Sequence, residues 1–173
     1  DVIRTDAHFG NASPDLERTD AALRKALRPL LAQGVTPVVP GFIGSAPDGE
    51  LTTLGRGGSD LTASLVGRAM AAARVNLWKD VPGLLTSDPR IVPDARVLPQ
   101  LNLREAAELA YYGAKVLHPR ALIPVKLWPG GTAAQGTTLR NGDLAMLLST
   151  SPDKHGEISL LLELGSFTKG QAL

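Results

Sequence analysis

Glycine, arginine, serine and aspartate are concentrated in one stretch, TTLGRGGSD at residues 52–60, which runs directly into an apolar, alanine-rich segment at 61–73. A glycine-rich loop that opens a helix leaves several backbone N–H groups unpaired, and the helix dipole there favours negative charge. Arg56 adds a cationic fork that suits a carboxylate or a phosphate. The stretch therefore predicts an anion-binding site at the start of a helix.

The same stretch has a purely structural explanation. Ser59 and Asp60 are good helix-capping residues, and glycine-rich turns before helices are common. The spacing matches neither the dinucleotide fingerprint nor the Walker A motif. Spacing alone therefore favours the structural explanation.

The composition is that of a globular protein. The 173 residues include 18 basic and 17 acidic side chains, and no basic cluster is interleaved with aromatic residues. The absence of cysteine excludes disulfides, thiolate metal sites and cysteine nucleophiles. No apolar run is long enough to cross a bilayer. We expect a soluble intracellular protein without nucleic-acid or membrane partners, and its abrupt start at Asp1 indicates that an N-terminal portion is absent.

The elements that would position the loop follow an α/β order. A helix capped by Thr19 or Asp20 and ended by Gly34 leads into a buried strand at residues 35–40. The helix after the glycine-rich stretch leads into a second buried strand at 75–79. Short connections on both sides of a helix indicate a parallel α/β unit.

The polar segment that follows, at 80–90, lies at the carboxyl end of the second strand, where open α/β sheets bind ligands. A capping box predicts a helix over 103–112. Pro119 is placed to begin another helical turn, and residues 125–128 suit a short strand.

Six motifs occur in a characteristic order: GFIG at 41–44, TLGRGGSD at 53–60, WKDV at 78–81, TSDPR at 86–90, EAAEL at 105–109 and GAKVLHP at 113–119. In this order and approximate spacing the chain resembles aspartokinases over about residues 1–124. The resemblance implies an α/β fold, the amino-acid-kinase-like three-layer sandwich, with a mainly parallel sheet and helices on both faces. Residues 1–139 would be the nucleotide-binding half of the kinase domain, and 140–173 a partial ACT-like regulatory module.

The reaction implied by the resemblance is phosphoryl transfer from ATP to the side-chain carboxylate of L-aspartate, the first step of lysine, threonine and methionine biosynthesis. A carboxylate acceptor is already ionised at neutral pH, so catalysis reduces to positioning and charge neutralisation. Mg²⁺ would accompany ATP. The family also implies lysine or threonine as effector, a homo-oligomer (dimer or tetramer), and a cytoplasmic location, or a plastid in a plant.

The family's pattern assigns Arg56 to the substrate carboxylate, with Ser59, Gly57 and Gly58 beside it, and places Asp60 near the reacting phosphate. The nucleotide would be bound by a second set of residues, namely Lys79, Asp80, Leu85, Arg90, Lys115 and Val116.

The structural alternatives for the nucleotide set are a solvated strand end for Lys79 and Asp80 and a helix-terminal charge for Lys115. Leu85 stands where many relatives have tyrosine against the adenine, so it offers apolar packing instead of ring stacking. His118, between Leu117 and Pro119, is interpreted as a packing histidine rather than a catalytic one.

The chain also departs from the family's pattern. It contains no Lys-Phe-Gly-Gly motif, whose lysine contacts the transferred phosphoryl group in the family. Between the helix that Pro119 begins and the strand expected from residue 125, it has several fewer residues than the family usually places there. Between Ser149 and Gly156 it has no room for an ACT helix. We therefore expect that segments are missing from this sequence. Two other functions stay open: a different amino acid kinase, or a non-catalytic nucleotide- or amino-acid-sensing module.

Overall fold

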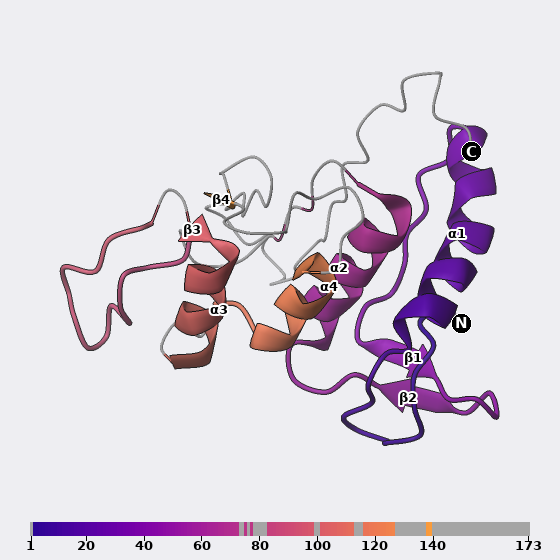
Figure 1. Cartoon of the computed structure of the whole chain (residues 1–173), viewed down its shortest axis with the longest axis horizontal. Helices are drawn as coiled ribbons and strands as arrows, with labels where there is room; N and C mark the ends of the chain where they lie inside the picture. Colours follow the sequence, from indigo (N-terminus) through magenta and orange to yellow (C-terminus); the bar gives the residue numbers. More distant parts are fainter. Residues whose placement is uncertain are drawn as a thin grey trace, which may run out of the picture.

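The computed structural model describes residues 2–72, 75, 77, 83–98, 101–112, 116–126 and 138–139 (Figure 1). The helical elements are α1 Leu16–Ala32, α2 Gly58–Met70, α3 Leu103–Tyr112, the short 3₁₀ helix η1 Pro119–Leu122, and α4 Ile123–Lys126. The strands are β1 Ile43–Ser45, β2 Leu51–Thr53, β3 Leu101–Asn102 and β4 Thr138–Leu139.

Helix α1 begins earlier than predicted. Its N-cap is Asp15, whose carboxylate accepts a hydrogen bond from the backbone N–H of Arg18 at 3.0 Å. The predicted caps, Thr19 and Asp20, are buried inside the helix, where tertiary contacts occupy their side chains. The predicted end is confirmed, because Gly34 follows the helix with a φ of +74°.

Strands β1 and β2 form an antiparallel hairpin that leads the chain to the glycine-rich loop. Ile43 pairs with Thr53 at the open end of this hairpin. At its closed end lies the predicted turn, where Gly49 has a φ of +94° and donates its N–H to the Ala46 carbonyl at 3.0 Å. The hairpin therefore sets the position from which the loop begins.

The mainly parallel sheet predicted from the sequence is not formed by the described strands. β1 pairs with β2 and β3 with β4, both antiparallel, and parallel pairing among the described residues is confined to one bridge between Arg4 and Ser45. Residues 35–40 have no regular structure, and Val35 and Val38 are 44% and 94% exposed. A buried strand needs a neighbouring strand, and none pairs with 35–40 in the described part of the chain.

The strands predicted at 75–79 and 125–128 also differ from the observed structure. Val75 and Leu77 are buried as expected but take part in no strand pairing, and the other residues of 75–79 lie outside the described ranges. Val125 and Lys126 belong to helix α4, because the helical turn that Pro119 begins continues into it. The predicted module at 140–173 lies outside the described residues.

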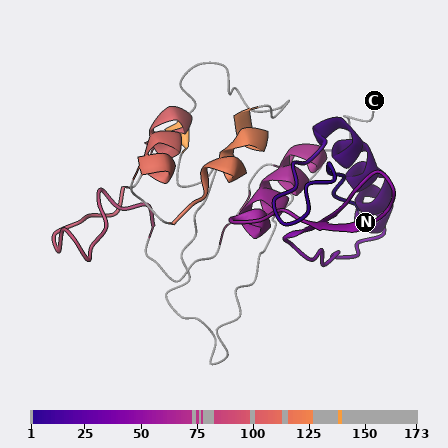
Figure 2. The same cartoon turned by 90° about the horizontal axis from the view of Figure 1, so that it is seen from below.

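Helix α2 occupies the centre of the described structure, as both views of the fold show (Figures 1 and 2). Helix α1 packs on one side of α2, and η1 and α4 pack on another. The predicted apolar stripe is confirmed, since Leu61, Leu65 and Ala69 are at most 2% exposed. Ala63 belongs to a second core cluster, which η1 and α3 share. Because α2 is buried between two clusters, its N-terminus is held firmly.

A charged cluster joins α1 to α2. Arg24 and Arg68, both partly buried, contact the Asp20 carboxylate with N–O distances of 3.4 and 3.3 Å. Arg24 also donates to the Ala69 carbonyl at 2.8 Å, near the C-terminus of α2. The cluster therefore fixes the end of α2 opposite to the glycine-rich loop.

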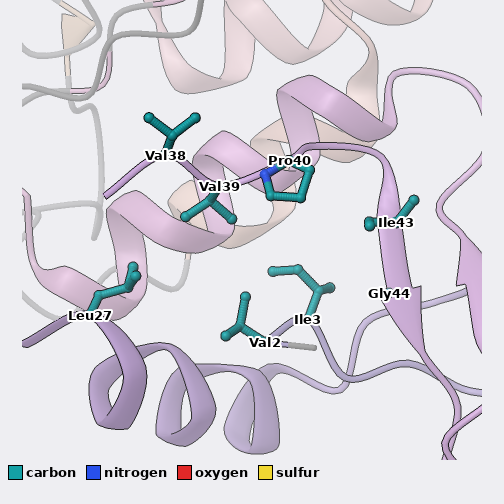
Figure 3. A pocket seen from close by; sticks show the side chains of 8 residues that line it. All are labelled: Val2, Ile3, Leu27, Val38, Val39, Pro40, Ile43 and Gly44. Atoms are coloured by element: carbon teal, nitrogen blue, oxygen red, sulfur yellow. The ribbon is translucent and has the colours of Figure 1, made fainter. Parts of the chain in front are cut away.

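A cavity of about 270 Å³ opens between the N-terminal segment, α1 and residues 38–44 (Figure 3). It is lined by Val2, Ile3, Leu27, Val38, Val39, Pro40, Ile43 and Gly44. These side chains are all apolar, so they offer no group that would orient a phosphate or a carboxylate. Among the described helices, none is long and apolar enough to span a membrane.

Candidate functional site

The candidate site is the glycine-rich loop at residues 54–57 and the first turn of α2. Gly55 and Gly57 have φ values of +72° and +71°, which only glycine adopts without strain. Gly57 is the N-cap of α2, and no side-chain hydrogen bond caps this helix end. The Gly58 N–H donates to the Gly55 carbonyl at 2.9 Å, and the dipole of α2 favours negative charge at this end of the helix.

Each glycine of the loop is also pressed against another segment. A Cβ atom added to Gly57 would lie 2.3 Å from the Cβ of His118, and one added to Gly55 would lie 2.8 Å from the Oδ1 atom of Asn11. One added to Gly58 would lie 2.9 Å from the Phe42 ring. Close packing, as well as turn conformation, thus requires glycine here.

Phe42 and Thr62 build the site without having been singled out from the sequence. Phe42 has a φ of +75°, an unusual conformation for a non-glycine residue. The hydroxyl of Thr62 accepts from the Phe42 N–H at 3.1 Å and donates to the Gly58 carbonyl at 2.9 Å. The Phe42 carbonyl accepts from the Leu54 N–H at 2.8 Å. The GFIG motif at 41–44 was the available signal, but its spacing did not show this role.

The predicted substrate residues are brought together at the start of α2. Arg56 and Ser59 are exposed, Gly57 and Asp60 are half-buried, and Gly58 is buried. Arg56 and the dipole of α2 both place positive charge at this point, while Asp60 adds a carboxylate in the first turn. The arrangement can bind a negatively charged ligand beside a single acidic side chain.

Three of the predicted nucleotide residues, Leu85, Arg90 and Val116, belong to the described part of the chain. Lys79, Asp80 and Lys115 lie outside the described residues. Val116 is half-buried and packs against the core cluster shared by α2, α3 and η1. Leu85 is 8% exposed and forms a single antiparallel bridge elsewhere in its own segment.

Arg90 lies in segment 83–98, which extends away from α2 beyond α3 in both views (Figures 1 and 2). Its guanidinium donates to the Asp88 carboxylate with distances of 3.0 Å from Nε to Oδ1 and 2.6 Å from Nη2 to Oδ2. This hydrogen bonding, together with charge attraction, raises the pKa of Arg90 above its usual value. The described contacts of Arg90 are thus local to its own segment.

His118 is the packing histidine that the sequence predicted. Its ring lies against Gly57, and its Nδ1 atom accepts from the Arg120 backbone N–H at 3.3 Å as the N-cap of η1.

Comparison with known proteins places the chain in a family. Residues 1–130 match the profile of the amino acid kinase family. The chain belongs to this family.

Among its relatives in the amino acid kinase family, the lysine-sensitive aspartokinase 3 of Escherichia coli is 48% identical over 123 residues, which are 71% of this chain and 27% of the relative. The aspartokinase of Rickettsia felis is 37% identical over 164 residues, or 95% of this chain and 39% of the relative. The chain therefore spans between about a quarter and two fifths of these relatives.

A solved structure is similar as well. The crystal structure of E. coli aspartokinase III in complex with aspartate and ADP has a TM-score of 0.70 and 46% identity, and the match covers 73% of this chain and 28% of that one. The fold of the described region is thus aspartokinase-like.

Proposed function

We propose that this chain takes part in the ATP-dependent phosphorylation of the side-chain carboxylate of L-aspartate, which yields 4-phospho-L-aspartate. The observation that carries the proposal is the start of α2 at the glycine N-cap Gly57, with the exposed Arg56 beside it. It is supported by 46% identity to an aspartokinase that was crystallised with aspartate and ADP.

On the substrate side, Arg56 binds a carboxylate of aspartate through its two-pronged guanidinium. Ser59 completes the anion site, and Gly57 and Gly58 let the ligand approach the backbone closely. Asp60 lies beside the reacting phosphate. The attacking carboxylate needs no base, so these residues act by positioning the substrate and stabilising charge.

On the nucleotide side, we assign Lys79, Asp80, Leu85, Arg90, Lys115 and Val116 to ATP. Mg²⁺ enters with ATP and is held mainly by phosphate oxygens and water. The Asp60 carboxylate is a hard oxygen donor of the kind that this ion prefers. To bind a phosphate, Arg90 would have to exchange its bond with Asp88 for one with the ligand.

We extend the proposal to regulation and assembly. A relative is described as lysine-sensitive, which supports lysine as effector, with threonine as the alternative. Residues 140–173 are assigned to a partial ACT-like module next to the kinase half at 1–139, whose complete fold is the three-layer sandwich. A homo-oligomer and a cytoplasmic or plastid location complete the proposal, with lysine, threonine and methionine biosynthesis as its pathway.

Calorimetry of the 173-residue chain with L-aspartate, and separately with MgATP, tests the proposal. We expect Arg56→Ala to weaken aspartate binding by about tenfold or more, since a hydrogen bond to a charged group contributes about 1.5–3 kcal/mol. Arg104→Ala, which removes an exposed arginine of α3, is the matched control and should bind normally.

Trapping of the acyl phosphate with hydroxylamine, in the presence of MgATP, reports the reaction itself. Aspartate hydroxamate would support phosphorylation of aspartate by this chain. Hydroxamate formed from glutamate instead would indicate a different amino acid kinase. Ligand binding without any hydroxamate would favour the sensing module.

A further inference from the structure

Arg120 makes three hydrogen bonds that join parts of the chain distant in sequence. Its Nη1 atom donates to the Asn11 Oδ1 atom and to the Leu54 carbonyl, both at 2.6 Å, and its Nη2 atom donates to the Ala12 carbonyl at 2.7 Å. These partners lie 109, 66 and 108 residues away along the chain. One guanidinium thus connects η1, the turn at residues 8–12 and the glycine-rich loop.

Two of the three acceptors lie beside Gly55. The Leu54 carbonyl belongs to the residue just before Gly55, and Asn11 is in van der Waals range of Gly55 itself. The Ala12 N–H donates to the Thr53 carbonyl at 2.9 Å, so the turn at 8–12 is already hydrogen-bonded to the end of β2. Arg120 adds three side-chain hydrogen bonds to the same two segments.

Arg120 is held in place by its own element. Ala121 and Leu122 are 1% and 2% exposed and anchor η1 in the core. His118 caps the backbone N–H of Arg120 and packs against Gly57. The backbone that carries the Arg120 side chain is therefore fixed beside the N-terminus of α2.

The chemistry of the acceptors requires an arginine. All three are neutral oxygens, one side-chain amide and two backbone carbonyls, so none of them forms an ion pair with the guanidinium. They need separate N–H groups with fixed directions, which a planar guanidinium provides and a single ammonium does not.

We propose that Arg120 is a positioning residue that fixes the glycine-rich loop against the turn at 8–12 and thereby holds Arg56 in its ligand-binding position. This role of Arg120 rests on the proposed function only in that the ligand is taken to be aspartate. The effect on the conformation of the loop can be measured without any ligand.

The test compares Arg120→Met, which removes the donors, with Arg120→Lys, which keeps the charge, in the 173-residue chain. Arg104→Met removes an exposed arginine from α3 and is the control. Hydrogen exchange is measured at the Ala12, Leu54 and Gly58 amides, and aspartate and MgATP affinities by calorimetry.

We expect protection of these three amides to fall by about tenfold in both Arg120 variants, while the amides of α1 keep theirs. We also expect aspartate affinity to fall by about tenfold or more with MgATP affinity unchanged, since small misplacement of a binding group is costly. General destabilisation would weaken both ligands and expose α1 as well, which would overturn the proposal.

Three other outcomes are decisive. Unchanged exchange in Arg120→Met would overturn the proposal, and full recovery in Arg120→Lys would do so too, because charge rather than geometry would then matter. If the unsubstituted chain binds no aspartate, the proposed function fails, and the exchange result alone decides whether Arg120 fixes the loop.

Discussion

Arg56 and Arg90 are both predicted site residues, yet their surroundings differ. Arg56 lies in a loop whose neighbours come from distant parts of the chain, such as His118 against Gly57. Arg90 lies in segment 83–98, where its partner Asp88 is two residues away. A site residue can therefore sit in a loop fixed by tertiary contacts or in a segment with mainly local ones.

The difference has an energetic consequence. Disturbing the glycine-rich loop breaks contacts among several elements at once, whereas disturbing the Arg90 side chain breaks an exposed ion pair. Folding free energy should therefore depend strongly on the first region and weakly on the second.

The largest effect is expected from Gly57→Ala. The new Cβ would collide with His118 at a φ of +71°. The left-handed conformation costs about 1–2 kcal/mol, and overpacking adds about 1–3 kcal/mol. Denaturant unfolding measures the loss of folding free energy.

Gly34→Ala is the matched control, since Gly34 has a φ of +74° and an added Cβ there would meet no atom within 4 Å. Equal losses in the two variants would show that packing against His118 contributes nothing.

Thr62→Val should have an intermediate effect. It keeps the shape of the side chain but removes the hydroxyl that holds Phe42 and Gly58, which leaves a polar group unsatisfied at a cost of about 1–3 kcal/mol. Ser64→Ala removes a hydroxyl whose bond is within α2, and should cost less than about 1 kcal/mol. The comparison is made by denaturant unfolding, and a larger loss in the serine variant would refute it.

A smaller effect is expected at acidic pH from Asp6. The Ser13 N–H, at 3.0 Å, is the main cause that lowers the pKa of this carboxyl, against slight burial and with help from His8. A lowered folded-state pKa stabilises the fold above the unfolded value of about 3.9, and this contribution is lost as pH falls through the folded value.

Asp6→Asn isolates this contribution. Thermal unfolding between pH 5 and 3 should show a smaller loss of stability in the variant than in the original chain. Parallel curves for the two chains would mean that the hydrogen bond from Ser13 does not matter for folding.

The smallest effect is expected from Arg90→Ala. The Arg90 side chain is 73% exposed, and an exposed ion pair contributes little to folding. The denaturant midpoint should match that of the original chain and of Arg104→Ala. A shift as large as that of Thr62→Val would remove the distinction between the two regions.

Much of the local structure could be read from the sequence. The helix at 103–112 was predicted with the bounds observed, and the turn at Gly49, the start of η1 at Pro119 and the apolar stripe of α2 were also correct. These features depend on residues within a few positions of one another. The prediction of a strand at 35–40 was wrong because strand pairing depends on partners far along the chain.

The sequence by itself determined the glycine-rich loop, the helix that follows it and the positive charge of Arg56 beside that helix, since conformational preference and charge reside in the residues themselves. Only the tertiary structure decided what fixes the loop. His118 and Arg120 reach it across more than sixty residues, and no local pattern encodes a contact of that span.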